Sequence, residues 1–105
     1  MTNFEIKTLT GVIKQTHQVV YDAALRGDRG EAYEDYLARL GQAVAEGTSL
    51  LRAAQGSIKG STARVGERPP RGVYVDTWRA FVRALTAARS TWYNEARARA
   101  VRSGR

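Results

Sequence analysis

The chain has 105 residues, a formal net charge of +7 and no cysteine, with 43% of its residues hydrophobic and 26% charged. These values are typical of one globular domain, and they exclude a disulfide framework and a zinc site built on thiolates. No stretch approaches the roughly 18 apolar residues of a membrane span, and no basic start followed by an apolar run marks a secretory signal. We therefore expect a single cytoplasmic domain over residues 1–105.

A first helix is predicted over residues 3–25. Thr2 and Glu5 have the spacing of a capping box, which satisfies backbone N–H groups at a helix start. Phe4 and Leu25 fall outside the apolar face of this helix, and we expect them to fold over the ends of the protein. That face consists of side chains that recur every three or four residues, namely Ile6, Leu9, Ile13, Thr16, Val20 and Ala24.

A second, central helix is predicted over residues 29–55. Asp28 and Glu31 have the spacing of another capping box, and Gly56 is expected to end the helix. Gly27 breaks the chain just before it, so the connection to the first helix is short. A short connection predicts that the two helices are neighbours.

The central helix carries an apolar stripe that is broader than a simple two-helix seam. A stripe of this width is typical of a helix that packs against two neighbours. On this stripe Gly47 lets a neighbour approach closely, whereas Gly41 is expected to point outward. Three tracks with seven-residue spacing form the stripe: Tyr36, Ala43 and Leu50; Tyr33, Leu40, Gly47 and Ala54; Leu37, Val44 and Leu51.

Residues 56–75 have no helical period and contain the pair Pro69-Pro70, which disfavours a helix through the middle. A loop of about twenty residues is unusual in a compact domain and tends to be functional or disordered. Its basic side chains outnumber Glu67 and give it a positive charge; they are Lys59, Arg64, Arg68 and Arg71.

A third helix is predicted over residues 76–102, with Asp76 or Thr77 as its cap. Arg89 lies near its apolar face and is interpreted as resting on Trp92 or Tyr93, the alternative being a contact to a partner carboxylate. Its buried face is Trp78, Phe81, Val82, Leu85, Ala88, Trp92 and Ala96. Small side chains form a strip on its far side: Ala80, Ala84, Ala87 and Ala98. We interpret this strip as exposed surface, with a homodimer contact through Ala80, Ala84 and Ala87 as the alternative.

These elements predict an all-α fold, an antiparallel three-helix bundle with a long basic loop between helices 2 and 3. In this arrangement the third helix ends near the start of the second. Three cations are therefore expected to approach three carboxylates: Arg97, Arg99 and Arg102 on one side, and Glu31, Glu34 and Asp35 on the other.

Positive charge is concentrated in the second half of the chain. Residues 1–56 carry six basic and seven acidic side chains, a net −1, whereas residues 57–105 carry eleven and three, a net +8. Such a division predicts a polyanionic partner. The residues expected to contact it are Lys59, Arg64, Arg68, Arg71, Arg79 and Arg83.

The groups that catalysis requires are few. His17 is the only histidine, at the edge of the first helix's apolar face, and no Ser-His-Asp set or phosphate-binding loop can be assembled. Capping and pairing with arginines explain Glu31, Glu34 and Asp35 better than Mg²⁺ binding does. We expect no enzyme, no cofactor, no metal and no catalytic residue.

The leading hypothesis is a small basic binding protein that docks on nucleic acid or a ribonucleoprotein. The alternative is a protein-binding module from a phage or mobile element, either an inhibitor of a host nucleic-acid-handling complex or a virion or adaptor component. A membrane-surface protein is disfavoured, because the aromatic residues of the third helix are needed in the core.

Overall fold

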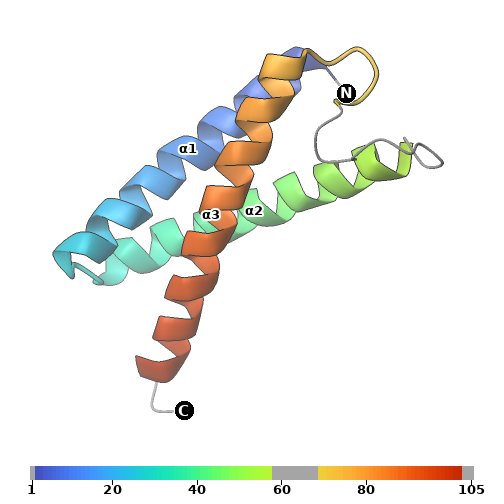
Figure 1. Cartoon of the computed structure of the whole chain (residues 1–105). Coiled ribbons are helices and arrows are strands. Elements are labelled where there is room, and N and C mark those ends of the chain that lie inside the picture. The colour runs from blue at the N-terminus through green and yellow to red at the C-terminus, as the bar shows by residue number, and fades with distance from the viewer. Residues whose placement is uncertain (1, 58–68, 103–105) are drawn as a thin grey trace.

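The computed structural model describes residues 2–57 and 69–102, and within these ranges it contains three helices and no strand (Figure 1). The helices are α1 (Asn3–Arg26), α2 (Glu31–Ser57) and α3 (Val75–Arg102), and all three pack against one another. This confirms the predicted all-α class with three helices. No helix of the described part combines the length and apolar character that crossing a membrane requires.

The start and end of α1 follow from local hydrogen bonding. The Thr2 hydroxyl accepts a hydrogen bond from the backbone N–H of Glu5 at 3.1 Å, and the Glu5 carboxylate accepts one from the backbone N–H of Thr2 at 3.3 Å. The predicted capping box is therefore confirmed. Gly27 ends the helix with a φ of 74°, a left-handed conformation that glycine adopts without steric cost.

Both predicted ends of the central helix differ from the structure. The helix α2 begins at Glu31, where the backbone N–H of Glu34 donates to the carbonyl of Gly30, so Asp28 lies too early to cap it. At its other end α2 continues through Gly56 to Ser57, since a glycine inside a helix costs only about 1 kcal/mol.

At the start of α3, the backbone N–H of Trp78 donates to the carbonyl of Tyr74 at 3.0 Å. The helix begins at Val75, so Asp76 lies within the first turn and Thr77 is buried. Neither residue is the cap that the sequence predicted.

The broad stripe of α2 forms the middle of the core. The α2 residues Leu37, Leu40 and Val44 are buried, and Leu51 is half-buried. Burying one such large apolar side chain stabilises a fold by about 1.5–3 kcal/mol. The buried residues contributed by the other two helices are Ile6, Ile13, Val20 and Ala23 of α1, and Trp78, Phe81, Leu85 and Ala88 of α3.

Hydrogen bonds fix which helix ends meet. The side-chain amide of Asn3 donates to the carbonyl of Gly72 at 3.1 Å and accepts from the backbone N–H of Tyr74 at 2.8 Å. The beginnings of α1 and α3 therefore lie side by side (Figure 1). The helix α2 crosses the other two, and its C-terminal part diverges from them in Figure 1.

Two glycines of α2 lie at close helix contacts. A Cβ on Gly47 would be 2.8 Å from Leu85 Cδ1 and 3.4 Å from Ile13 Cδ1, so this glycine makes room where all three helices meet. A Cβ on Gly41 would be 2.5 Å from Trp92 Nε1. Gly41 therefore faces α3, and the prediction that it points outward was wrong.

The two apolar residues expected over the ends of the protein do not cover them. Phe4 is 78% exposed and Leu25 is 70% exposed. Neither of them belongs to the hydrophobic core, which closes without them. Their exposure leaves apolar surface on α1.

Candidate functional site

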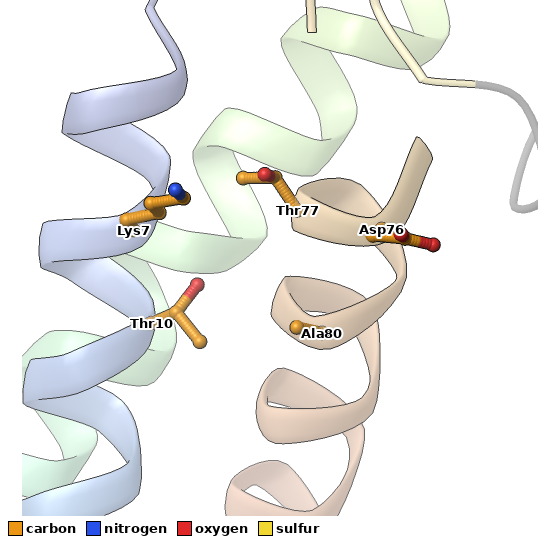
Figure 2. Close-up of a pocket in the computed structure, with 5 residues that line it drawn as sticks. All are labelled: Lys7, Thr10, Asp76, Thr77 and Ala80. Atoms are coloured by element: carbon orange, nitrogen blue, oxygen red, sulfur yellow. The ribbon is translucent and has the colours of Figure 1, made fainter. Parts of the chain in front are cut away.

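Three hollows lie along the boundary between α1 and α3, and we call them together the groove. The first hollow has a volume of about 310 Å³, and Lys7 and Thr10 of α1 face α3 across it (Figure 2). On the α3 side it is lined by Asp76, Thr77 and Ala80. In Figure 2 the Asp76 carboxylate points away from α1 and does not face the Lys7 ammonium group.

The middle hollow has a volume of about 330 Å³ and adjoins the first at Ala80. Its charged side chains are Lys14 on α1 and Arg83 on α3. Its remaining lining residues are His17, Ala80, Ala84 and Ala87. This part of the groove is therefore basic at its sides and lined by small residues between them.

His17 bridges the two helices at this point. Its Nε2 lies 2.8 Å from the Thr91 hydroxyl, a hydrogen bond between α1 and α3. Burial lowers the pKa of the His17 imidazole below its ordinary value of 6.5. The neutral form of the ring is accordingly favoured at pH 7.

The last hollow has a volume of about 260 Å³ and ends in a neutralised cluster. Arg29 Nε lies 3.1 Å from Glu95 Oε2, and the Tyr33 hydroxyl donates a hydrogen bond to the same carboxylate. The remaining residues that line this hollow are Tyr21, Ala24, Leu25, Thr91 and Asn94. Because Glu95 balances Arg29, positive charge in the groove is confined to its first and middle hollows.

The pKa values of this cluster reflect its hydrogen bonds. Burial raises the pKa of the Glu95 carboxyl, but the hydrogen bonds from Arg29 and Tyr33 outweigh it and hold that pKa below 4.5. Burial, together with the hydrogen bond to Glu95, raises the pKa of Tyr33 to about 12. Arg29, Tyr33 and Glu95 therefore form a charged, hydrogen-bonded tie between the start of α2 and α3. The sequence prediction missed this tie.

Cations at the end of α3 are largely engaged within the fold. Arg99 Nη1 lies 3.0 Å from Glu34 Oε2, and Arg102 Nη2 lies 3.6 Å from Glu34 Oε1. The predicted approach of these two arginines to the start of α2 is confirmed. The Arg97 guanidinium instead lies over the Tyr93 ring, 5.4 Å from its centroid.

Three cations, Lys7, Lys14 and Arg83, line the groove, and we group them with the exposed Arg71 and Arg79 as the basic strip. All five side chains are exposed, and none forms an ion pair with another residue of the described ranges. These five side chains therefore carry positive charge that no ion pair within the described ranges compensates.

Of the six predicted contact residues, Arg83 lines the groove, and Arg71 and Arg79 are exposed. The other three, Lys59, Arg64 and Arg68, lie outside the described residues. Lys7 and Lys14 also line the groove but were not among the predicted contact residues, because the first half of the chain has a net negative charge. Their seven-residue spacing, which places both on one side of a helix, was the available signal.

The structure differs from the sequence prediction for the alanine strip of α3 and for Arg89. Ala80, Ala84 and Ala87 line the groove next to Lys14 and Arg83 rather than forming a strip away from the other helices. Arg89 is exposed, and the guanidinium that lies over the Tyr93 ring belongs to Arg97. The predicted exposure therefore holds for Ala80 and Ala87, whereas Ala84 and Ala98 are half-buried. Periodicity along one helix does not reveal how far a neighbouring helix extends across it.

The side of α1 that faces away from the groove is bordered by carboxylates and exposed apolar side chains. Hollows between α1 and α2 are bordered by the carboxylates Glu5 and Glu46, and the exposed Phe4 and Val12 lie beside them. The other residues that line these hollows are Thr8, Leu9, Ser49 and Leu50. We call this surface the apolar-acidic face. The two sides of α1 therefore differ in charge and in apolar exposure.

In the ranges that the structure describes, no group of three or more histidine, aspartate or glutamate side chains gathers as a metal site would require. Comparison of the chain with protein-family models, curated proteins and solved structures gives no match.

Proposed function

We propose that this protein is a small, basic, non-enzymatic binding protein that docks on a polyanion, nucleic acid or a ribonucleoprotein, through the basic strip. The observation that carries the proposal is the convergence of Lys7 and Lys14 of α1 with Arg83 of α3 on one groove. Side chains from two separate parts of the sequence contribute positive charge there, and no carboxylate lines the middle hollow.

The spacing of these cations suits a chain of phosphates. With a rise of 1.5 Å per residue, Lys7 and Lys14 are separated by about 10 Å along α1, and Arg79 and Arg83 by about 6 Å along α3. Small residues between the two rows let a sugar-phosphate backbone approach closely. Phosphates neutralised by these cations release counterions, which drives association. Contacts of this kind position a protein on nucleic acid without reading its sequence.

The proposal includes the finer architecture that the sequence predicts, an antiparallel three-helix bundle with a long basic loop. Contacts between the start of α2 and the end of α3, such as that of Tyr33 with Glu95, support opposite directions for these helices. In this proposal Lys59, Arg64 and Arg68 extend the basic strip beyond Arg71.

Binding of a fluorescent 20-nucleotide single-stranded DNA and its RNA counterpart tests the proposal. We expect micromolar affinity at about 50 mM salt that weakens steeply as salt is raised. The variant Lys14→Gln/Arg83→Gln should bind at least about tenfold more weakly, which corresponds to about 1.4 kcal/mol.

The matched control is Arg52→Gln, which removes one exposed cation from α2, away from the groove. It should lose much less affinity than the groove variant. Absence of binding at about 50 mM salt, or equal losses per charge for the control and the groove variant, would contradict the proposal.

A second candidate function is supported by the apolar-acidic face. Phe4 is 78% exposed next to Val12, and large exposed apolar side chains that lie together are typical of protein interfaces. In this alternative the protein is a module from a phage or mobile element that inhibits a host nucleic-acid-handling complex or serves as a virion or adaptor component. Recovery from nuclease-treated lysate of a stoichiometric protein partner, lost on Phe4→Ser, would favour it.

A homodimer through Ala80, Ala84 and Ala87 is less favourable than polyanion binding at the same place. A symmetric dimer uses the same patch on both copies. Lys14 and Arg83 border these alanines, so the two copies would bring like charges together. A monomeric mass in sedimentation experiments at low salt would agree with this reasoning.

A further inference from the structure

We propose that the middle hollow of the groove is a phosphate site whose affinity is controlled by a proton on His17. The inference rests on the proposed polyanion-binding function and assigns one phosphate group of that ligand to a place between Lys14 and Arg83. It predicts that binding takes up a proton and becomes tighter as the pH falls.

The geometry supplies an anion site on three sides. Lys14 approaches from α1, Arg83 from α3, and His17 lies between the helices, with alanines completing the lining. The volume of about 330 Å³ is ample for a phosphate group and part of its sugar. An ammonium, a guanidinium and an imidazole are all phosphate ligands when charged.

The surroundings of His17 explain why its proton would be linked to the ligand. Its neighbours on α1 are Lys14 and Tyr21, whose ring centroid lies 5.9 Å from that of the imidazole. On α3 it faces Arg83 and the Thr91 hydroxyl, and no residue of α2 lines this hollow. Both charged neighbours are cations, so the imidazolium has no counter-ion from the described lining.

An anion bound between Lys14 and Arg83 supplies that counter-ion. It stabilises the imidazolium and therefore raises the pKa of His17 in the complex. By linkage, the protonated protein then binds the anion more tightly than the neutral protein does. The Thr91 hydroxyl accommodates both states, because it donates to a neutral ring nitrogen and accepts from a protonated one.

The chain contains one histidine, so its imidazole resonances can be assigned without ambiguity. The experiment measures the pKa of His17 by NMR in sodium sulfate and in sodium chloride at equal ionic strength. Sulfate stands in for phosphate because its charge is constant across pH 5–8. We expect sulfate to raise the pKa of His17 by about 0.5, which corresponds to about threefold tighter anion binding by the protonated protein.

The variant Lys14→Gln/Arg83→Gln should abolish the sulfate effect, while Arg52→Gln should preserve it. An equal His17 pKa in both salts, or an effect that persists in the groove variant, would overturn the inference. Circular dichroism of each variant establishes that the helices remain folded.

A second measurement separates this inference from the proposed function. The affinity for a 20-nucleotide oligo-dT, whose phosphodiester charge is constant across this pH range, is measured at pH 5.5 and pH 8. We expect about threefold tighter binding at pH 5.5 for the wild type and a smaller change for His17→Gln. Tight binding with identical pH dependence in both proteins would overturn the proton-linked site and leave the proposed function standing. A sulfate effect without oligo-dT binding would support the anion site and contradict the proposed function.

Discussion

The indole of Trp92 packs directly against the backbone of Gly41. A Cβ on Gly41 would lie 2.5 Å from Trp92 Nε1 and 3.1 Å from Cε2, closer than side-chain atoms ordinarily approach. A large aromatic group of α3 thus occupies the space that any other residue at position 41 would fill. This contact sets how closely α2 and α3 approach one another.

The substitution Gly41→Ala should destabilise the protein. Alanine gains about 1 kcal/mol in helix propensity, but forcing the rigid indole to move costs about 1–3 kcal/mol. We expect a net loss of about 1 kcal/mol in the free energy of unfolding, measured by urea denaturation.

The matched control is Gly11→Ala on the exposed side of α1, where an added Cβ meets nothing within 4 Å. It should raise the free energy of unfolding by about 0.5–1 kcal/mol. A stabilising effect of Gly41→Ala similar to that of Gly11→Ala would contradict the packing described above.

Periodicity predicted the core well and the outer flanks of each helix less well. The seven-residue tracks correctly identified Leu40 and Val44 as buried, because one helix face determines burial whichever neighbour covers it. Gly41 lies on a flank that becomes buried only through the position of Trp92 on α3. Single-helix patterns contain no information about that crossing.

Contacts between charged groups were also predicted only in part, because a pattern along one helix does not show how that helix lies against another. The approach of Arg99 to Glu34 follows from the order of the helices and was predicted. The pairing of Arg29 with Glu95 joins residues 66 positions apart and depends on the register of α3, which periodicity does not supply. Placing Lys14 beside Arg83 needs the same register. The basic strip could therefore be predicted only in part.

The tie between Arg29, Tyr33 and Glu95 should make stability depend on pH in acid. The pKa of Glu95 is lower in the folded protein than its ordinary value of 4.5. The contribution of Glu95 to the free energy of unfolding is therefore fully present above pH 4.5. It is lost as the pH falls through the lower pKa of the folded state. The difference in unfolding free energy between wild type and Glu95→Gln should shrink between pH 5 and pH 3. A difference that is constant over this range would contradict the role of the carboxylate.

Tyr33 provides an independent measure of the same tie. Its pKa of about 12, against 10.0 ordinarily, predicts one tyrosine that ionises late in an alkaline titration followed at 295 nm. The protonated Tyr33 hydroxyl stabilises the folded protein below pH 10, and this stabilisation is lost as the pH rises towards 12. Tyr33→Phe should remove the late step and cost about 1 kcal/mol at pH 7. If all tyrosines of the folded protein ionised near pH 10, the hydrogen bond to Glu95 would be disproved.

Truncation of the two phenylalanines should affect stability to very different extents. Phe81 is completely buried in the core, and Phe81→Ala should cost about 3–5 kcal/mol. Phe4 is 78% exposed, and Phe4→Ala should change stability by about 0.5 kcal/mol or less. Thermal or urea unfolding of both variants checks this. A loss at Phe4 approaching that at Phe81 would show that Phe4 covers the end of the protein after all.

The central claim is that cations from α1 and α3 act together on phosphates, and the salt dependence of binding tests it most directly. The logarithm of the association constant for a single-stranded oligonucleotide falls with the logarithm of salt concentration by about 0.7 for each phosphate neutralised. Removing both Lys14 and Arg83 should therefore reduce the slope by about 1.4, whereas Arg52→Gln should leave it unchanged. A slope that is the same for the wild type and the Lys14→Gln/Arg83→Gln variant would contradict the claim.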